Sequence, residues 1–118
     1  MMDADGGQKQ RIQQKEDELR DRVIYLAMDL APAGRGIYRY LEERTGIPAA
    51  RWQNVMLKRQ LPTLAMLIAL LDYRRPYAEW LLTGDDLGQG RSPSNERWES
   101  FLKHREWVQG NKAAGKED

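Results

Sequence analysis

The segment GIPAARWQNV, residues 46–55, carries polar side chains that can form paired hydrogen bonds beside a single large aromatic one. If the segment is helical and Trp52 faces the core, a step of about 100° per residue points Asn54 outward and leaves Gln53 and Arg51 on its two shoulders. Asn and Gln can bind N6 and N7 of adenine in a bidentate manner, and Arg can bind O6 and N7 of guanine in the same way. The chemistry that this pattern indicates is recognition of base edges in the DNA major groove, not bond-making.

Small and basic residues near this face are consistent with the same interpretation. Ala49 and Ala50 allow a backbone to approach closely, and an alanine methyl can contact a thymine methyl. Arg39, Lys58 and Arg59 supply cations for phosphates. The alternative is that the helix only presents a solvated polar surface.

The charges of the chain are unevenly distributed. The net charge of the 118 residues is only +1, but residues 35–75 contain eight basic and three acidic side chains. The segments on either side each carry a net charge of −2. A basic centre between acidic flanks indicates a polyanion-binding surface, although an arginine-rich surface exposed only to solvent would give the same count.

Several classes of chemistry lack the residues that they need. There is no cysteine, and His104 is the only histidine, so a zinc site would require carboxylates alone as its other ligands. Asp85 and Asp86 do not follow the spacing of a calcium loop, and no phosphate-binding glycine loop, nucleophile elbow or catalytic triad is recognisable. We therefore expect no metal, no cofactor, no small-molecule substrate and no enzymatic activity.

No segment has the pattern of a targeting or membrane-spanning sequence. The start of the chain lacks the features of a secretory signal, and the most apolar stretch, residues 61–71, is shorter than the roughly 20 residues that cross a bilayer. The absence of cysteine agrees with a reducing compartment. The sequence predicts a cytoplasmic protein without membrane contact.

Helical periodicity predicts the elements that would position the polar face, with no strand among them. Residues 1–16 are predicted to be a flexible or frayed extension, with a helix that starts between Gln8 and Asp17 and ends before Pro32. The apolar stripe of this helix consists of Leu19, Val23, Leu26 and Leu30.

Residues that end or start helices divide the middle of the chain. Gly46 is expected to end one helix in the left-handed conformation, and Pro48 to begin the next. Thr63 is an N-cap for the helix that follows it, and Gly84 ends a short helix that Pro76 opens. The inward stripe predicted for the helix after Thr63 consists of Leu64, Leu67, Ile68 and Leu71.

The C-terminal part is predicted to contain one amphipathic helix. Residues 85–93 have the composition of a linker, residues 94–109 form the helix, and residues 110–118 are expected to be disordered. The apolar side chains of the helix are Trp98, Phe101 and Leu102. Either the helix folds back on the core, or these side chains form a dimer contact, for which the N-terminal helix is the competing surface.

Three stretches, in this order, resemble the lambda-repressor-like helix-turn-helix family of the Cro and phage-repressor type. YLEERTGIPAARWQNV (40–55) is similar to the helix-turn-helix itself, KRQLPTLAMLIALL (58–71) to the basic turn and leucine-rich fourth helix, and YAEWLLTG (77–84) to the closing fifth helix. The resemblance covers residues 17–84. It implies a compact five-helix bundle, here with helical N- and C-terminal extensions. It also implies sequence-specific binding of double-stranded DNA by a homodimeric transcriptional regulator of bacterial or phage type.

By this resemblance, residues 36–45 form the second helix and residues 48–58 the recognition helix. The base-facing residues that it implies are Ala49, Ala50, Arg51, Gln53 and Asn54. The phosphate-facing residues, with Arg39 included for its charge, are Tyr38, Arg39, Lys58, Arg59 and Gln60.

Three positions depart from the pattern of the family. Glu42 stands where a small residue is usual, so it is expected to tilt the helix pair or to form an ion pair with Arg51 or Arg39. Tyr38 stands where glutamine is more frequent, and Leu57 is an apolar residue on the outward face. The alternative function is a protein-interaction module on a repressor-like fold that does not read DNA. Its partner surface, or a dimer contact, would consist of Leu57, Trp98, Phe101 and Leu102.

Overall fold

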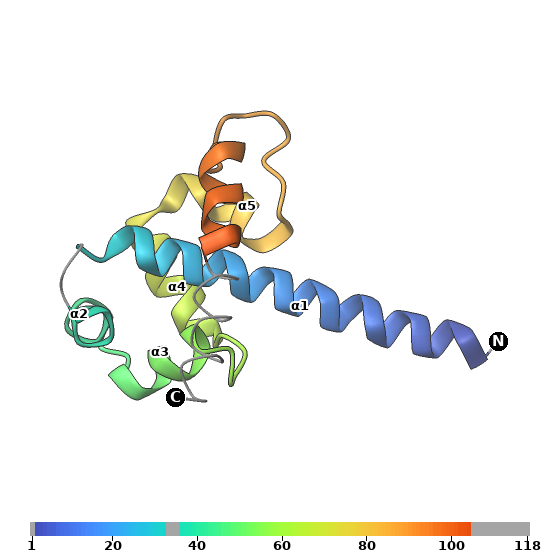
Figure 1. The fold of residues 1–118 in the computed structure, drawn as a ribbon, viewed down its shortest axis with the longest axis horizontal. Helices are drawn as coiled ribbons and strands as arrows, with labels where there is room; N and C mark the ends of the chain where they lie inside the picture. The colour runs from blue at the N-terminus through green and yellow to red at the C-terminus, as the bar shows by residue number, and fades with distance from the viewer. Residues whose placement is uncertain (1, 33–35, 105–118) are drawn as a thin grey trace, which may run out of the picture.

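The structure, a computed structural model, describes residues 2–32 and 36–104 of the chain (Figure 1). Within these ranges every regular element is a helix, which confirms the predicted all-α class. The elements are α1 (Met2–Leu30), α2 (Ile37–Thr45), α3 (Ala49–Met56), α4 (Leu64–Tyr73), the short 3-10 helix η1 (Arg75–Tyr77), α5 (Ala78–Thr83) and a last helix over residues 95–104. The predicted end of that helix at residue 109 and the predicted tail, 110–118, lie outside the described residues.

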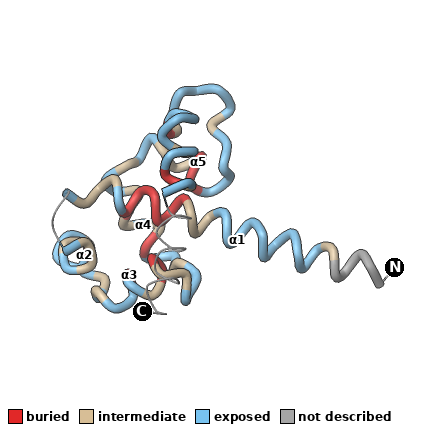
Figure 2. Tube along the Cα trace, in the orientation of Figure 1, coloured by how far each residue is buried: buried red, intermediate tan, exposed pale blue. Residues whose placement is uncertain are grey.

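The C-terminal half of α1 forms the centre of the core. Residues 22–27 are buried on every side of the helix, and Val23 and Leu26 are fully covered, as the apolar stripe predicts. A helix that is buried all round needs neighbours on all its sides, and α1 packs against α3, α4 and α5. Figure 2 shows the buried stretch in red where α1 crosses the other helices.

The N-terminal half of α1 extends beyond the bundle (Figure 1). The helix begins at Met2, ahead of the interval from Gln8 to Asp17 in which the sequence predicts its start, so residues 2–16 are helical where a frayed segment is expected. Residues 8–18 are exposed. An exposed polar helix has no apolar periodicity, and periodicity is the signal on which the predicted start depends.

Several helices end or begin where the sequence predicts, because local backbone chemistry determines these positions. Gly46 (φ 76°) and Gly84 (φ 83°) adopt the left-handed conformation, and their N–H groups donate to carbonyls four residues earlier. The Thr63 hydroxyl accepts a hydrogen bond from the N–H of Met66 at 3.3 Å, and Ser94 caps the last helix in the same way.

α4 buries a different stripe from the predicted one. Met66 and Leu70 are buried, whereas Leu64 and Ile68 are 72% and 56% exposed, so their predicted inward orientation is wrong. The other two leucines of the predicted stripe are half-buried. The sequence of α4, LAMLIALLDY, is apolar nearly all round, so periodicity alone does not select the face that packs on the core.

The last helix folds back onto the bundle through an aromatic cluster. Trp98 packs edge-on against Trp80 of α5 with ring centroids 5.4 Å apart, and Phe101 packs against Tyr25 of α1 at 5.3 Å. Phe101 is buried and Leu102 half-buried. Of the two alternatives, the structure shows the fold-back, because Trp98 and Phe101 pack on aromatic side chains of α5 and α1.

One carboxylate organises the segment 85–93, which the sequence predicts as a linker. Asp86 accepts hydrogen bonds from the N–H groups of Gly88 (3.0 Å) and Arg91 (2.8 Å) and from the hydroxyl of Ser92 (2.8 Å). The Ser92 hydroxyl makes the largest contribution to lowering the pKa of Asp86, and the two N–H groups add to it, because all three stabilise the ionised form.

We expect this turn to lose order on acidification. Because the pKa of Asp86 is lowered in the folded chain, the contribution of its carboxylate to stability is present at neutral pH and is lost as the pH falls through the lowered value. The amide NMR signals of Gly88 and Arg91 should follow this titration, and the dependence should disappear in Asp86→Asn. If the shifts of these amide signals had a midpoint at or above the ordinary pKa of an aspartate, the hydrogen-bonding role would be contradicted.

Candidate nucleic-acid interface

α2 and α3 pack against each other across a three-residue corner that begins at Gly46. α2 agrees with the predicted second helix to within one residue. α3 is shorter than predicted, because Pro48 precedes it as the N-cap and Lys58 has already turned into the left-handed conformation, with φ 61°. The predicted helix-turn-helix region is therefore a pair of short helices joined by a tight corner.

The hydroxyl of Thr45 joins the two helices. It donates to the carbonyl of Leu41 (2.6 Å) and accepts from the N–H of Ile47 (3.2 Å) and from Nε1 of Trp52 (3.2 Å). A hydroxyl has one donor and two acceptor positions, so its whole capacity is used. Trp52 is fully buried, which confirms that its indole faces the core. Together these contacts fix the rotation of α3 about its own axis.

Glu42 caps α3 from the neighbouring helix. Its Oε1 accepts a hydrogen bond from the N–H of Ala49 at 2.7 Å. The expected ion pair with Arg51 or Arg39 does not form among the described residues; Arg39 instead lies 3.4 Å from Glu43, one turn along α2. A carboxylate is favourable at a helix N-terminus because the first N–H groups lack partners and the helix dipole is positive there. Glu42 therefore stabilises the corner between α2 and α3.

Glu42→Ala is expected to lower the free energy of unfolding by about 1 kcal/mol, the typical cost of losing an N-cap. Glu42→Gln keeps an acceptor oxygen at the same reach and should recover most of this loss. Urea denaturation followed by circular dichroism measures both variants. Glu43→Ala is the matched control, because its exposed pair with Arg39 contributes little in water. Equal losses at positions 42 and 43 would contradict the capping role.

The outer face of α3 carries the predicted base-facing side chains. Ala50, Arg51 and Gln53 are exposed, and Ala49 and Asn54 are half-buried. Within the described part of the chain, the three polar side chains of this face make no hydrogen bond or ion pair. α3 lies at the edge of the molecule, on the opposite side of α1 from the last helix (Figure 1). The donors and acceptors of this face are therefore not used by the described residues.

The predicted phosphate-facing residues differ in how free their side chains are. The exposed members are Arg39, Arg59 and Gln60, and Tyr38 at the start of α2 is half-buried. Lys58 is different, because its Nζ lies 3.0 Å from Oδ1 of Asp21 on α1. Any contact of Lys58 with another molecule must compete with this ion pair.

The charge of this region remains positive. Residues 36–60 contain five basic and two acidic side chains. One of the two carboxylates, that of Glu42, is bound to a backbone N–H of α3 rather than to a cation. Arg51 on α3 and Arg59 in the turn after it are both exposed, so their charges are accessible to an anion outside the chain.

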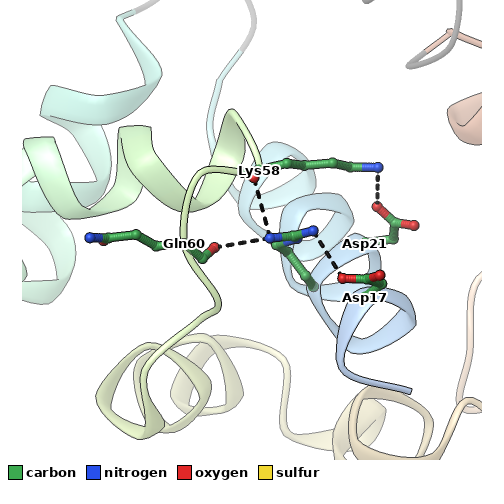
Figure 3. A network of polar contacts seen from close by, with 5 residues as sticks. Asp17, Asp21, Lys58 and Gln60 are labelled. Atoms are coloured by element: carbon green, nitrogen blue, oxygen red, sulfur yellow. Dashed lines mark hydrogen bonds and ion pairs between the residues drawn. The ribbon is translucent and has the colours of Figure 1, made fainter. Parts of the chain in front are cut away.

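α1 holds the turn after α3 with polar side chains that sequence reasoning did not identify (Figure 3). Nη1 of Arg20 donates to the carbonyls of Lys58 and Gln60, each at 3.4 Å, and Nη2 donates to Asp17 at 3.0 Å. Nε of Arg20 is buried without a partner in the described ranges. Arg20 is separated from these carbonyls by 38 and 40 residues, so no local pattern signals the contacts.

The exposed apolar side chains of this region are not the ones that the sequence predicts. Leu57, expected on the outward face, is half-buried where α3 ends. The turn after α3 and the following helix expose Leu61, Leu64 and Ile68. The exposure of Leu64 and Ile68 was not predicted, because the helical periodicity of the sequence places both on the inward stripe of their helix.

The described residues define a compact all-helical protein in which a short helix presents polar side chains at the edge of the molecule. Comparisons with protein-family models, with curated proteins and with solved structures find no match for this chain. The lambda-repressor-like resemblance therefore depends on the three sequence stretches alone. No helix in the described ranges is long and apolar enough to cross a bilayer, and no three His, Asp or Glu side chains in them are grouped to bind a metal ion.

Proposed function

We propose that the protein binds double-stranded DNA in a sequence-specific manner by inserting α3 into the major groove, and that it acts as a cytoplasmic transcriptional regulator of bacterial or phage type. The observation that carries the proposal is the orientation of α3. Burial of Trp52 turns Arg51, Gln53 and Asn54 away from the centre of the core. The proposed activity is binding rather than catalysis, and it needs no metal or cofactor.

The side chains of α3 match the chemistry of base edges. The major groove is about 12 Å wide and admits a helix. Gln53 and Asn54 carry the amide that pairs with N6 and N7 of adenine, and Arg51 the guanidinium that pairs with O6 and N7 of guanine. Ala49 and Ala50 permit close approach and can contact thymine methyl groups.

Side chains that flank α3 would bind the phosphates on either side of the groove. Arg39 and Arg59 supply charge, while Tyr38 and Gln60 supply hydrogen-bond donors. Arg39 can leave Glu43 at little cost, because both side chains of that pair are largely exposed. Phosphate contacts of this kind set the register of the protein on the duplex and carry no sequence information.

We further infer that two copies bind one operator. Helix-turn-helix regulators read half-sites that lie about 34 Å apart, and a two-fold symmetric site needs a two-fold symmetric protein. Sedimentation of the complex with a selected duplex should give two chains per duplex. A complex of one chain per duplex at saturation would overturn the dimer.

Selection of bound sequences from a random DNA pool tests the proposed function. We expect enrichment of a short motif that consists of two symmetry-related half-sites. The logarithm of the affinity for this motif should fall linearly with the logarithm of the salt concentration. Equal retention of all sequences would overturn sequence specificity, and no retention even at low salt would overturn DNA binding.

The second candidate function is a protein-interaction module on the same helical fold. The exposed Leu64 and Ile68, one turn apart on α4, favour it, because clustered apolar side chains on a surface are typical of protein contacts. An adaptor of this kind would retain no DNA in the selection above, so one experiment separates the two candidates.

A further inference from the structure

Lys58 is a basic residue beside the proposed DNA-binding helix whose amine is already bound within the chain. Its Nζ lies 3.0 Å from Oδ1 of Asp21 on α1, and the two side chains are only 32% and 23% exposed (Figure 3). Salt screens a partly buried pair less than an exposed one. The amine is therefore held on α1 rather than in the solvent beside α3.

The backbone of the same turn is held independently of this amine. Nη1 of Arg20 donates to the carbonyls of Lys58 and Gln60, and the N–H of Lys58 donates to the carbonyl of Val55 at 3.0 Å. Lysine has a flexible four-carbon stem. Lys58 can thus leave Asp21 by rotation of its side chain alone, without any movement of α3.

We propose that Asp21 limits the affinity of the protein for DNA by holding the Lys58 amine, an inference that rests on the DNA-binding function proposed above. Asp21 and a DNA phosphate compete for one cation. When phosphate binds the amine, the Asp21 carboxylate loses its partner and remains close to a polyanion. The new contact is offset by the lost ion pair and by this repulsion, so Lys58 adds little to the affinity of the wild-type protein.

Asp21→Asn tests the competition on random-sequence duplex DNA, because phosphate contacts do not depend on sequence. Each additional phosphate that a protein neutralises changes the slope of log affinity against log salt by about −0.9. We expect the slope to steepen by this amount and the affinity at 0.1 M salt to rise roughly fivefold. Glu16→Gln removes the same charge from an exposed position on α1 and should leave the slope unchanged.

Lys58→Met separates the competition from a simple loss of negative charge. In the wild-type background it should leave the slope nearly unchanged, and in the Asp21→Asn background it should abolish the steepening of the slope. The proposal would be overturned if Asp21→Asn steepened the slope equally with and without Lys58→Met. If Asp21→Asn does not fold, Lys58→Met alone still tests the proposal. A slope flattened by about 0.9 would show that Lys58 already binds phosphate in the wild-type protein and would overturn the proposal.

Acetylation of lysines, read by mass spectrometry, gives a measurement that needs no DNA. Lys58 should react faster in Asp21→Asn than in the wild-type protein, whereas the exposed Lys15 should react equally in both. Faster acetylation with unchanged DNA affinity would overturn the competition and leave the proposed function intact. Failure of both proteins to bind DNA would overturn the two proposals together.

Discussion

Trp52→Ala is expected to lower the free energy of unfolding by about 3 to 5 kcal/mol, the range found when a large buried aromatic side chain is truncated. The indole is fully buried, and its N–H donates to Thr45 at 3.2 Å. Truncation would leave a cavity at the junction of α2 and α3 and an acceptor position of the Thr45 hydroxyl without its donor. Natural domains have a total stability of about 5 to 15 kcal/mol, so this loss should remove a large part of it.

Two further variants separate the contributions of this side chain. Trp52→Phe keeps most of the apolar contact and loses the hydrogen bond, so it should cost clearly less than Trp52→Ala. Trp98→Ala truncates a tryptophan that is only half-buried, and should also cost less. Urea denaturation followed by far-ultraviolet circular dichroism measures all three without relying on tryptophan fluorescence. A loss below about 1 kcal/mol for Trp52→Ala would contradict the central position of the indole in the corner.

The sequence predicts features that depend on local chemistry. Only glycine adopts a positive φ without strain, so Gly46 and Gly84 indicate where helices end. Thr63 has the side chain that an N-cap requires. The orientation of α3 follows from a single large aromatic residue, Trp52, among small and polar neighbours, and burying any other face would leave that ring in water.

Features without a local signal were not predicted correctly. The polar N-terminal half of α1 has no apolar stripe, so periodicity does not reveal that it is helical. In α4, the stripes that start at Leu64 and at Met66 are similarly apolar, and only packing against α1 decides between them.

The polar contacts between distant segments were also missed. Arg74 lies 3.2 Å from Asp29 of α1, and Arg97 of the last helix binds the other oxygen of the same carboxylate. The Asp21–Lys58 pair is of the same kind. Each depends on the complete arrangement of the helices, and a charged residue in a sequence has many possible partners. For the candidate site, the sequence therefore predicts that Arg51 and Gln53 point outward, but not which cations are already bound within the chain.

Asn54→Ala is expected to weaken binding to the selected DNA sequence by about 1 to 3 kcal/mol, or roughly fivefold to 150-fold. The reason is the loss of a bidentate contact with an adenine edge. Binding to random-sequence DNA and the slope of its salt dependence should not change, because a neutral amide neutralises no phosphate. Arg51→Ala should behave differently, since it removes a base contact and a positive charge together, and so should weaken binding to both kinds of DNA. Competition mobility shifts with the selected duplex and its base-pair variants measure these effects.

The structure makes Asn54→Ala a selective change. The carbonyl of Asn54 accepts hydrogen bonds from the N–H groups of Arg59 (2.8 Å) and Gln60 (3.2 Å), and these backbone contacts do not involve the side chain. Alanine therefore keeps the turn that follows α3 and removes only the amide. Asn95→Ala, at an exposed position in the last helix, is the matched control and should leave all affinities unchanged. A loss of affinity that is equal on every sequence for Asn54→Ala would show that this side chain does not read bases, because the loss of a base-edge contact weakens binding only to sequences that carry that base.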